Sequence, residues 1–177
     1  YVLNDVMSPL VENLYERISE NSDKYSIFIE ALNQTSWKDS LSIIYDEIRQ
    51  EDNTVIQQKR NYTLLAVSDD TYRSEGVTSV ADLAVKTGAV GTDYKDETNE
   101  LFRYVAYHVI GGSYSVFDFN NFSGGTTTKL WTTKADAVLE ASLQSGNKLY
   151  FNYEGEIDGQ SVKAMFVEDG SDVQAKN

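Results

Sequence analysis

The spacing of apolar residues changes once along this chain, close to Gly111-Gly112. Before that point apolar side chains recur every three or four residues, as they do on the buried face of a helix. After it, apolar and polar residues alternate in short runs that turn residues separate, a pattern typical of strands. A helical first part followed by a strand-rich second part predicts an α+β fold.

Capping residues locate several of the helices. Ser8-Pro9 suits a helix start, residues 78–83, TSVADL, resemble a capping box that leads into a short helix, and Gly88 suits the end of that helix. The expected helices lie at residues 10–18, 25–32, 78–88 and from about 96 to 108, and Trp37 and Leu41 continue the apolar face of the second.

The strands are bounded by turn signals such as Asn120-Asn121, Gly124-Gly125 and Asp158-Gly159. They are expected at residues 62–67, 114–119, 126–132, 138–143, 148–154 and 162–167. Short connections between the later ones predict antiparallel pairing. Residues 42–60 fit two interpretations, because Ile43, Ile44 and Ile48 suit a helix whereas the segment from Gln50 is polar enough for a surface excursion.

Charge excludes one class of partner. The chain has 177 residues, the size of one domain, with 15 basic and 28 acidic side chains and a formal net charge of −13. An acidic surface repels phosphate backbones, so we expect no nucleic-acid partner. No window approaches the ~18 apolar residues that a membrane span needs, so none is expected.

Few residues could carry catalysis or hold a cofactor. The chain has no cysteine and one histidine, His108, so we predict no catalytic thiol and no zinc or other transition-metal site. Its acidic clusters lack the spacing of a calcium loop, and phosphate-binding glycine motifs are absent. We therefore expect no cofactor and no catalytic residue, and interpret His108 as a hydrogen-bonded core residue. A carboxylate-based hydrolase is the enzymatic alternative, although Glu154 and Glu156 flank an expected turn.

Aromatic residues gather after the change of period. Tyr114, Phe117, Phe119 and Phe122 fit either core packing or an exposed set that stacks on sugar rings or docks a protein. A surface glycan-binding accessory protein is therefore the alternative function that these residues support.

Two segments resemble the signatures of one family. Residues 63–72, TLLAVSDDTY, resemble the first signature of fasciclin (FAS1) domains, and residues 101–110, LFRYVAYHVI, resemble the second, which is centred on a Tyr-His pair. Residues 26–32 and 171–177 fit the family as well. The chain departs from the pattern at Leu65, Val67 and Gly111, where phenylalanine, proline and proline are usual.

This resemblance implies a single FAS1-like domain over residues 1–177, with an insertion near 42–60 and without the family's last strand. It implies a β-sandwich or wedge of about seven strands with several helices packed against it. It also implies a non-enzymatic role in cell adhesion or surface interaction, with a protein or glycan partner bound at Tyr107 and His108. The acidic charge and the missing cysteines favour an exported bacterial member, secreted or held in the cell envelope as a lipoprotein.

Overall fold

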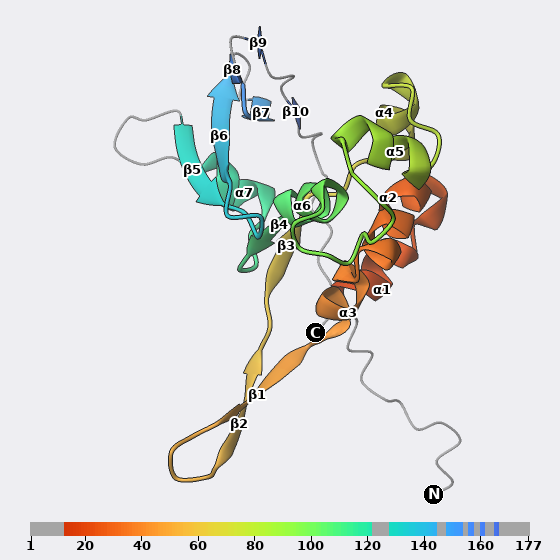
Figure 1. Ribbon diagram of the computed structural model, residues 1–177. Helices are drawn as coiled ribbons and strands as arrows, with labels where there is room; N and C mark the ends of the chain where they lie inside the picture. Colours follow the sequence, from red (N-terminus) through yellow and green to blue (C-terminus); the bar gives the residue numbers. More distant parts are fainter. Residues whose placement is uncertain are drawn as a thin grey trace, which may run out of the picture.

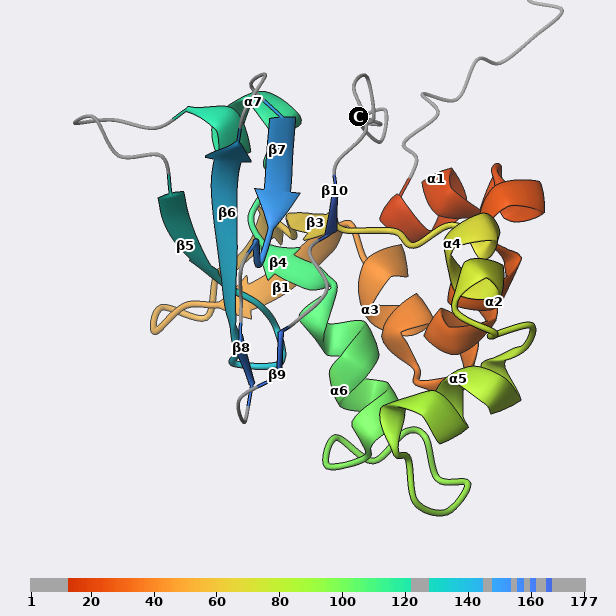
Figure 2. The ribbon, with the colours of Figure 1, turned by 90° about the horizontal axis from the view of Figure 1, so that it is seen from above.

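The computed structural model describes residues 13–121, 128–144, 148–153, 156–157, 160–161 and 165–166. Ser8-Pro9, Phe122, Glu154 and the segment 171–177 lie outside them. The first part of the chain forms the helices α1 (Leu14–Ser19), α2 (Ser22–Gln34), α3 (Trp37–Ser42), α4 (Asp69–Ser74), α5 (Val80–Thr87) and α6 (Glu100–Tyr107). These helices gather on one side of the molecule and the later strands on the other (Figure 1, Figure 2). The prediction of a mixed α and β fold is confirmed.

The described strands form small antiparallel sheets. The largest has the order β10-β7-β6-β5, from β5 (Thr128–Thr132), β6 (Val138–Gln144), β7 (Lys148–Phe151) and β10 (Met165–Phe166). Two short pairs join β3 (Tyr62–Leu64) to β4 (Val109–Gly111) and β8 (Glu156–Ile157) to β9 (Gln160–Ser161). A bridge between Ile110 and Thr133 links the β3-β4 pair to the end of β5. The predicted antiparallel pairing is confirmed.

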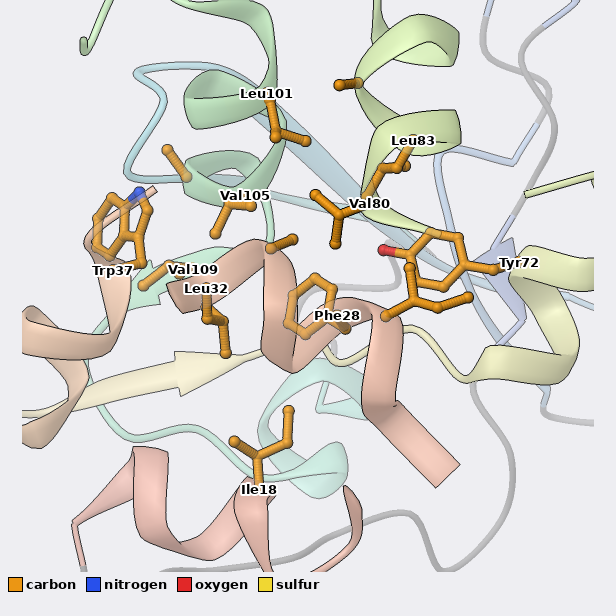
Figure 3. Packing of buried hydrophobic residues seen from close by; sticks show 14 of the residues in the cluster. Ile18, Phe28, Leu32, Trp37, Tyr72, Val80, Leu83, Leu101, Val105 and Val109 are labelled. Atoms are coloured by element: carbon orange, nitrogen blue, oxygen red, sulfur yellow. The ribbon is translucent and has the colours of Figure 1, made fainter. Parts of the chain in front are cut away.

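The helices enclose one hydrophobic core. Phe28 and Leu32 of α2 are fully buried and meet Leu101 and Val105 of α6 in a single cluster, which Figure 3 shows from close by. Val109, the first residue of β4, belongs to the same cluster. The helical stripe predicted around residues 25–32 therefore faces the interior.

A second core lies against the large sheet. It consists of Ile110, Phe119, Leu139, Ala141, Leu149 and Phe151. Phe119 belongs to a short helix, α7 (Val116–Asn120), so the strand predicted at 114–119 is wrong. The reason is local capping, because Ser115 Oγ accepts a hydrogen bond from Asp118 N and the Asp118 carboxylate accepts one from Ser115 N. The hydrogen bonds that the Asp118 carboxylate accepts from Ser115 N and from Ser115 Oγ also lower the pKa of Asp118.

Residues 42–60 contain a β-hairpin in place of the helix that the isoleucines suggested. Its strands are β1 (Tyr45–Arg49) and β2 (Val55–Lys59), and it projects away from the rest of the molecule (Figure 1). The loop closes where Asn53 N donates to Gln50 O and Asn53 adopts a φ of 64°. A turn followed by a left-handed residue is a common way to close a three-residue hairpin loop. The surface excursion expected here is confirmed, since residues 47–58 are all exposed.

Gly88 ends α5 as predicted, and its conformation supports a test. Its φ is 81°, and a Cβ atom built there would meet no atom within 4 Å. Gly88→Ala is therefore expected to lower the free energy of unfolding by about 1 kcal/mol through backbone strain alone. Urea unfolding measures this, with Gly111→Ala as the control, because Gly111 lies in β4 outside the positive-φ range. An equal loss in both variants would contradict the strain argument.

Candidate functional site

The two segments that resemble family signatures lie side by side. They supply β3 and β4, which pair antiparallel with Leu64 opposite Val109. Beyond the strands, Leu65 N donates to His108 O at 2.8 Å, and Thr63 Oγ1 donates to Gly112 O at 2.9 Å. Two segments with 28 residues between them in the sequence therefore form one continuous piece of structure.

Asp69, from the first of these segments, is a buried carboxylate. It stands at the first position of α4, where the hydroxyl of Ser68 caps the helix by accepting from Thr71 N. The Asp69 carboxylate accepts hydrogen bonds from Ser26 Oγ and from Ile27 N, the latter at 3.0 Å. Arg73 lies 3.6 Å from the same carboxylate. Asp69 thus ties α4 to the first turns of α2.

His108, from the second segment, is buried at the end of α6. Its Nδ1 lies 2.8 Å from Tyr104 O, which can only accept, so Nδ1 carries the proton. The ring packs against Phe28 and Tyr104, with centroids 5.6 and 4.6 Å away. Burial lowers the pKa of His108, whereas the bond to Tyr104 O acts in the opposite direction. Its interpretation as a hydrogen-bonded core residue is confirmed.

Tyr107, its neighbour, turns toward the sheet. Its hydroxyl donates to Val138 O at 3.4 Å and accepts from Asn152 Nδ2 at 2.6 Å. Of the Tyr107-His108 pair, the half-buried Tyr107 is therefore the one that reaches the surface.

Nearby, burial raises the pKa of both Tyr72 and Tyr104, whose hydroxyl oxygens are 3.1 Å apart.

His108→Ala is expected to lower the free energy of unfolding by ~1–3 kcal/mol at neutral pH, because packing and a buried hydrogen bond are lost. In the unfolded chain the His108 imidazole binds a proton below a pKa of about 6.5, whereas in the folded chain the pKa of His108 is lower. The stability that His108 contributes is thus fully present above that pH and declines as pH falls toward the folded pKa. Urea titrations at about pH 7.5 and 5.5 should show the difference between wild type and variant shrink. A pH-independent difference would contradict this.

The aromatic residues after Gly112 divide between core and surface. Phe119 is buried, and Tyr114 packs beside it, while Phe117 exposes 71% of its surface. Phe122 lies outside the described residues. Trp131 of β5 completes the group, with its ring centroid 4.4 Å from that of Tyr114 and 4.7 Å from that of Phe119. Trp131 was not predicted in this role, although the alternation of apolar and polar residues in its strand would have indicated it.

A hollow lies between α3, the segment before α6 and the turn after β5. Its volume is about 370 Å³, and its lining consists of Ser36, Trp37, Ser40, Lys95, Glu97, Phe102 and Lys134. Two lysines face one glutamate there, a local charge opposite in sign to that of the whole chain. Trp37 Nε1 is buried and has no hydrogen-bond partner within the described ranges. Residues from three distant segments form this hollow, so no sequence motif announced it.

Two other features bear on function. In the part of the chain that the structure describes, no helix is both long and apolar enough to cross a membrane. Within those same residues, no group of three or more His, Cys, Asp or Glu side chains is placed to hold a metal ion. Comparison with models of known protein families gives no match, and comparison with curated proteins gives none either.

Proposed function

We propose that this chain is a non-enzymatic interaction module of the fasciclin (FAS1) type, which acts in adhesion or partner binding outside the cell. The observation that carries the proposal is the pairing of β3 with β4, because it joins the two signature-like segments. The buried Asp69 and His108 are further support, since one signature-like segment supplies each of them.

The proposal includes the finer points of the resemblance. The chain is a single FAS1-like domain of the sandwich or wedge type, exported to the cell envelope or secreted by a bacterium. The half-buried Tyr107 hydroxyl is then the part of the Tyr-His pair that a protein or glycan partner would meet first.

Surface display tests the proposal. Non-adherent cells that display the chain should attach to protein- or glycan-coated plates more than cells that display an unrelated acidic domain of equal size. Purified chain should leave chromogenic glycosides intact. Background attachment on every coating would contradict the interaction role, and turnover of a glycoside would favour the carboxylate hydrolase instead.

Glycan binding is the second candidate, and Phe117 favours it. Phe117 is 71% exposed against 36% for Tyr114, so it is the more exposed of these two aromatic residues, and it stands on α7 close to Tyr114 in sequence. Phe117→Ala should abolish signals on a glycan array, whereas Val85→Ala, which removes an even more exposed apolar side chain from α5, should not. An array without signal for the wild-type chain would exclude this candidate.

The net charge makes attachment sensitive to salt. With a charge of −13, the chain should bind a basic coating such as polylysine more strongly at low ionic strength. Raising salt from about 0.05 to 0.5 M shortens the screening length several-fold, so retention should fall by at least about tenfold. Retention measured by biolayer interferometry that stayed constant over this range would contradict an electrostatic contribution.

A further inference from the structure

The projecting hairpin is built without support from a third described strand. Two-stranded hairpins alone are marginal in water, so this one depends on its own contacts. At its base, Arg60 donates two hydrogen bonds to the Asp46 carboxylate, which lowers the pKa of Asp46. At its tip, the Asp52 carboxylate accepts from both Thr54 N and Thr54 Oγ1. The result is a preformed arm that extends away from both cores (Figure 1).

The direction of its backbone groups follows from two hydrogen bonds. Gln50 N donates to Thr54 O at one end, and Arg60 N donates to Ile44 O at the other, each at 2.8 Å. Because hydrogen-bonded pairs alternate along an antiparallel ladder, the even-numbered residues face the partner strand. The N–H and C=O groups of Val55, Gln57 and Lys59 therefore point outward from β2. No described strand pairs with either outer edge of the hairpin.

Charge distinguishes the two edges. β1 carries Asp46, Glu47 and Arg49 among its five residues, whereas β2 carries only Lys59. Charged side chains on an edge strand discourage further pairing, and an uncharged edge invites it. From Asn53 to Gln58 the β2 side of the hairpin has no charge at all.

Side chains on one face define a register. Ile48 and Ile56 stand directly opposite each other in the hairpin, and both are exposed. A two-fold axis beside Ile56 would place it against Ile56 of a second copy and extend this pair into a row of four isoleucines. Gln57 then lies opposite Val55 of the second copy, and the outward N–H and C=O groups of these two residues are paired in both copies, whereas Lys59 lies opposite Asn53 of the loop.

We propose that two copies of this chain associate through β2, antiparallel, to form a four-stranded β1-β2-β2-β1 sheet. A second copy of the chain therefore pairs with the open edge of β2. This inference rests on the proposed interaction role and names another copy of the same chain as the partner. Since each copy carries −13, salt should tighten the dimer by screening repulsion. That dependence is opposite to the one expected for a basic partner.

Proline substitutions test the edge assignment. Gln57→Pro removes an outward N–H from β2 without removing a bond between β1 and β2, and Glu47→Pro does the same on β1. In sedimentation equilibrium the wild type and Glu47→Pro should be dimeric at a concentration where Gln57→Pro is monomeric. The dimer dissociation constant of Gln57→Pro should be at least tenfold higher than that of the wild type. Far-ultraviolet circular dichroism and thermal midpoints confirm that both variants fold.

Cysteine cross-linking tests the register, because the chain has no cysteine of its own. Ile56→Cys should form a covalent dimer rapidly under mild oxidation, since directly opposed residues in a non-hydrogen-bonded pair are close enough for a disulfide. Ile48→Cys is the matched control, because the proposed sheet separates the two copies of position 48 by two further strands. It should cross-link at least tenfold more slowly.

Three outcomes would overturn the proposal. The first is a wild-type chain that stays monomeric at every concentration and salt. The second is loss of the dimer in Glu47→Pro alone together with fast cross-linking of Ile48→Cys, which would assign pairing to β1, where Glu47 would face Arg49 of the second copy. The third is a monomer whose Val55 and Gln57 amides resist hydrogen exchange, because another segment of the same chain would then cover the edge. The display assay with Gln57→Pro separates the dimer proposal from the proposed interaction role. If only the dimer proposal is wrong, cells that display Gln57→Pro should still attach to the coated plates.

Discussion

Asp69→Ala is expected to lower the free energy of unfolding by about 3 kcal/mol. The substitution removes the acceptor for Ser26 Oγ and for the buried Ile27 N, which lie on a different helix. Alanine offers no substitute acceptor, so the buried Ile27 N keeps its desolvation cost without a hydrogen bond, whereas Ser26 is an exposed residue whose hydroxyl water can reach. Urea unfolding followed by circular dichroism measures the loss.

Asp70→Ala is the matched control for that variant. Asp70 is the next residue on α4, its side chain is 96% exposed, and its ion pair with Arg73 spans 3.3 Å in solvent. Its loss should change the free energy of unfolding by no more than about 0.5 kcal/mol. If both variants lost the same amount, the tie between α4 and α2 would not be the cause.

Phe119→Ala is expected to lower the free energy of unfolding by about 4 kcal/mol, because a buried aromatic ring leaves a cavity in a small core. The ring packs edge-on against Phe151 at 5.2 Å and beside Trp131, so no neighbour can fill its place without moving. Phe117→Ala is the control on the same helix, where the exposed ring should contribute less than about 0.5 kcal/mol. Similar losses for both would contradict the placement of Phe119 in the core.

The two tryptophans allow the same experiment to test the single-domain proposal. Trp37 lies in the helical core and Trp131 packs against the second core. In Trp37→Phe, fluorescence reports on the second core alone, and circular dichroism reports mainly on the helices. Coincident urea transitions are expected for one cooperative domain. Separate transitions would show that residues 1–177 contain two units.

The helical part was predictable because its signals are local. Ser79 and Gly88 bound α5 as their cap chemistry requires, and the apolar stripe placed His108 in the interior. The prediction failed where two local signals compete. Residues 114–119 alternate as a strand would, yet the capping box of Ser115 and Asp118 starts a helix there. In the hairpin, the left-handed conformation of Asn53 closes the loop between β1 and β2, and the helical spacing of the isoleucines gave no indication of it.

Contacts between distant segments were beyond the sequence pattern. The bond from Ser26 to Asp69 spans 43 residues, and the hydroxyl of Tyr107 meets Asn152 45 residues later. Periodicity assigns a residue to a face but does not say which element covers that face. For the same reason four aromatic residues that are close along the chain were predicted to act together, whereas Trp131 packs with Tyr114 and Phe119 in space.

The short strand β4 has a consequence for folding accuracy. Val109 and Ile110 are consecutive, and each is an almost fully buried member of a different core. Adjacent side chains of a strand point to opposite faces, so a slip of one residue against β3 would withdraw an anchor from both cores at once. A misaligned β3-β4 pair therefore has no half-correct intermediate in which one core is complete. Both cores therefore require the same register of β4 against β3, and this register aligns the helices with the sheet.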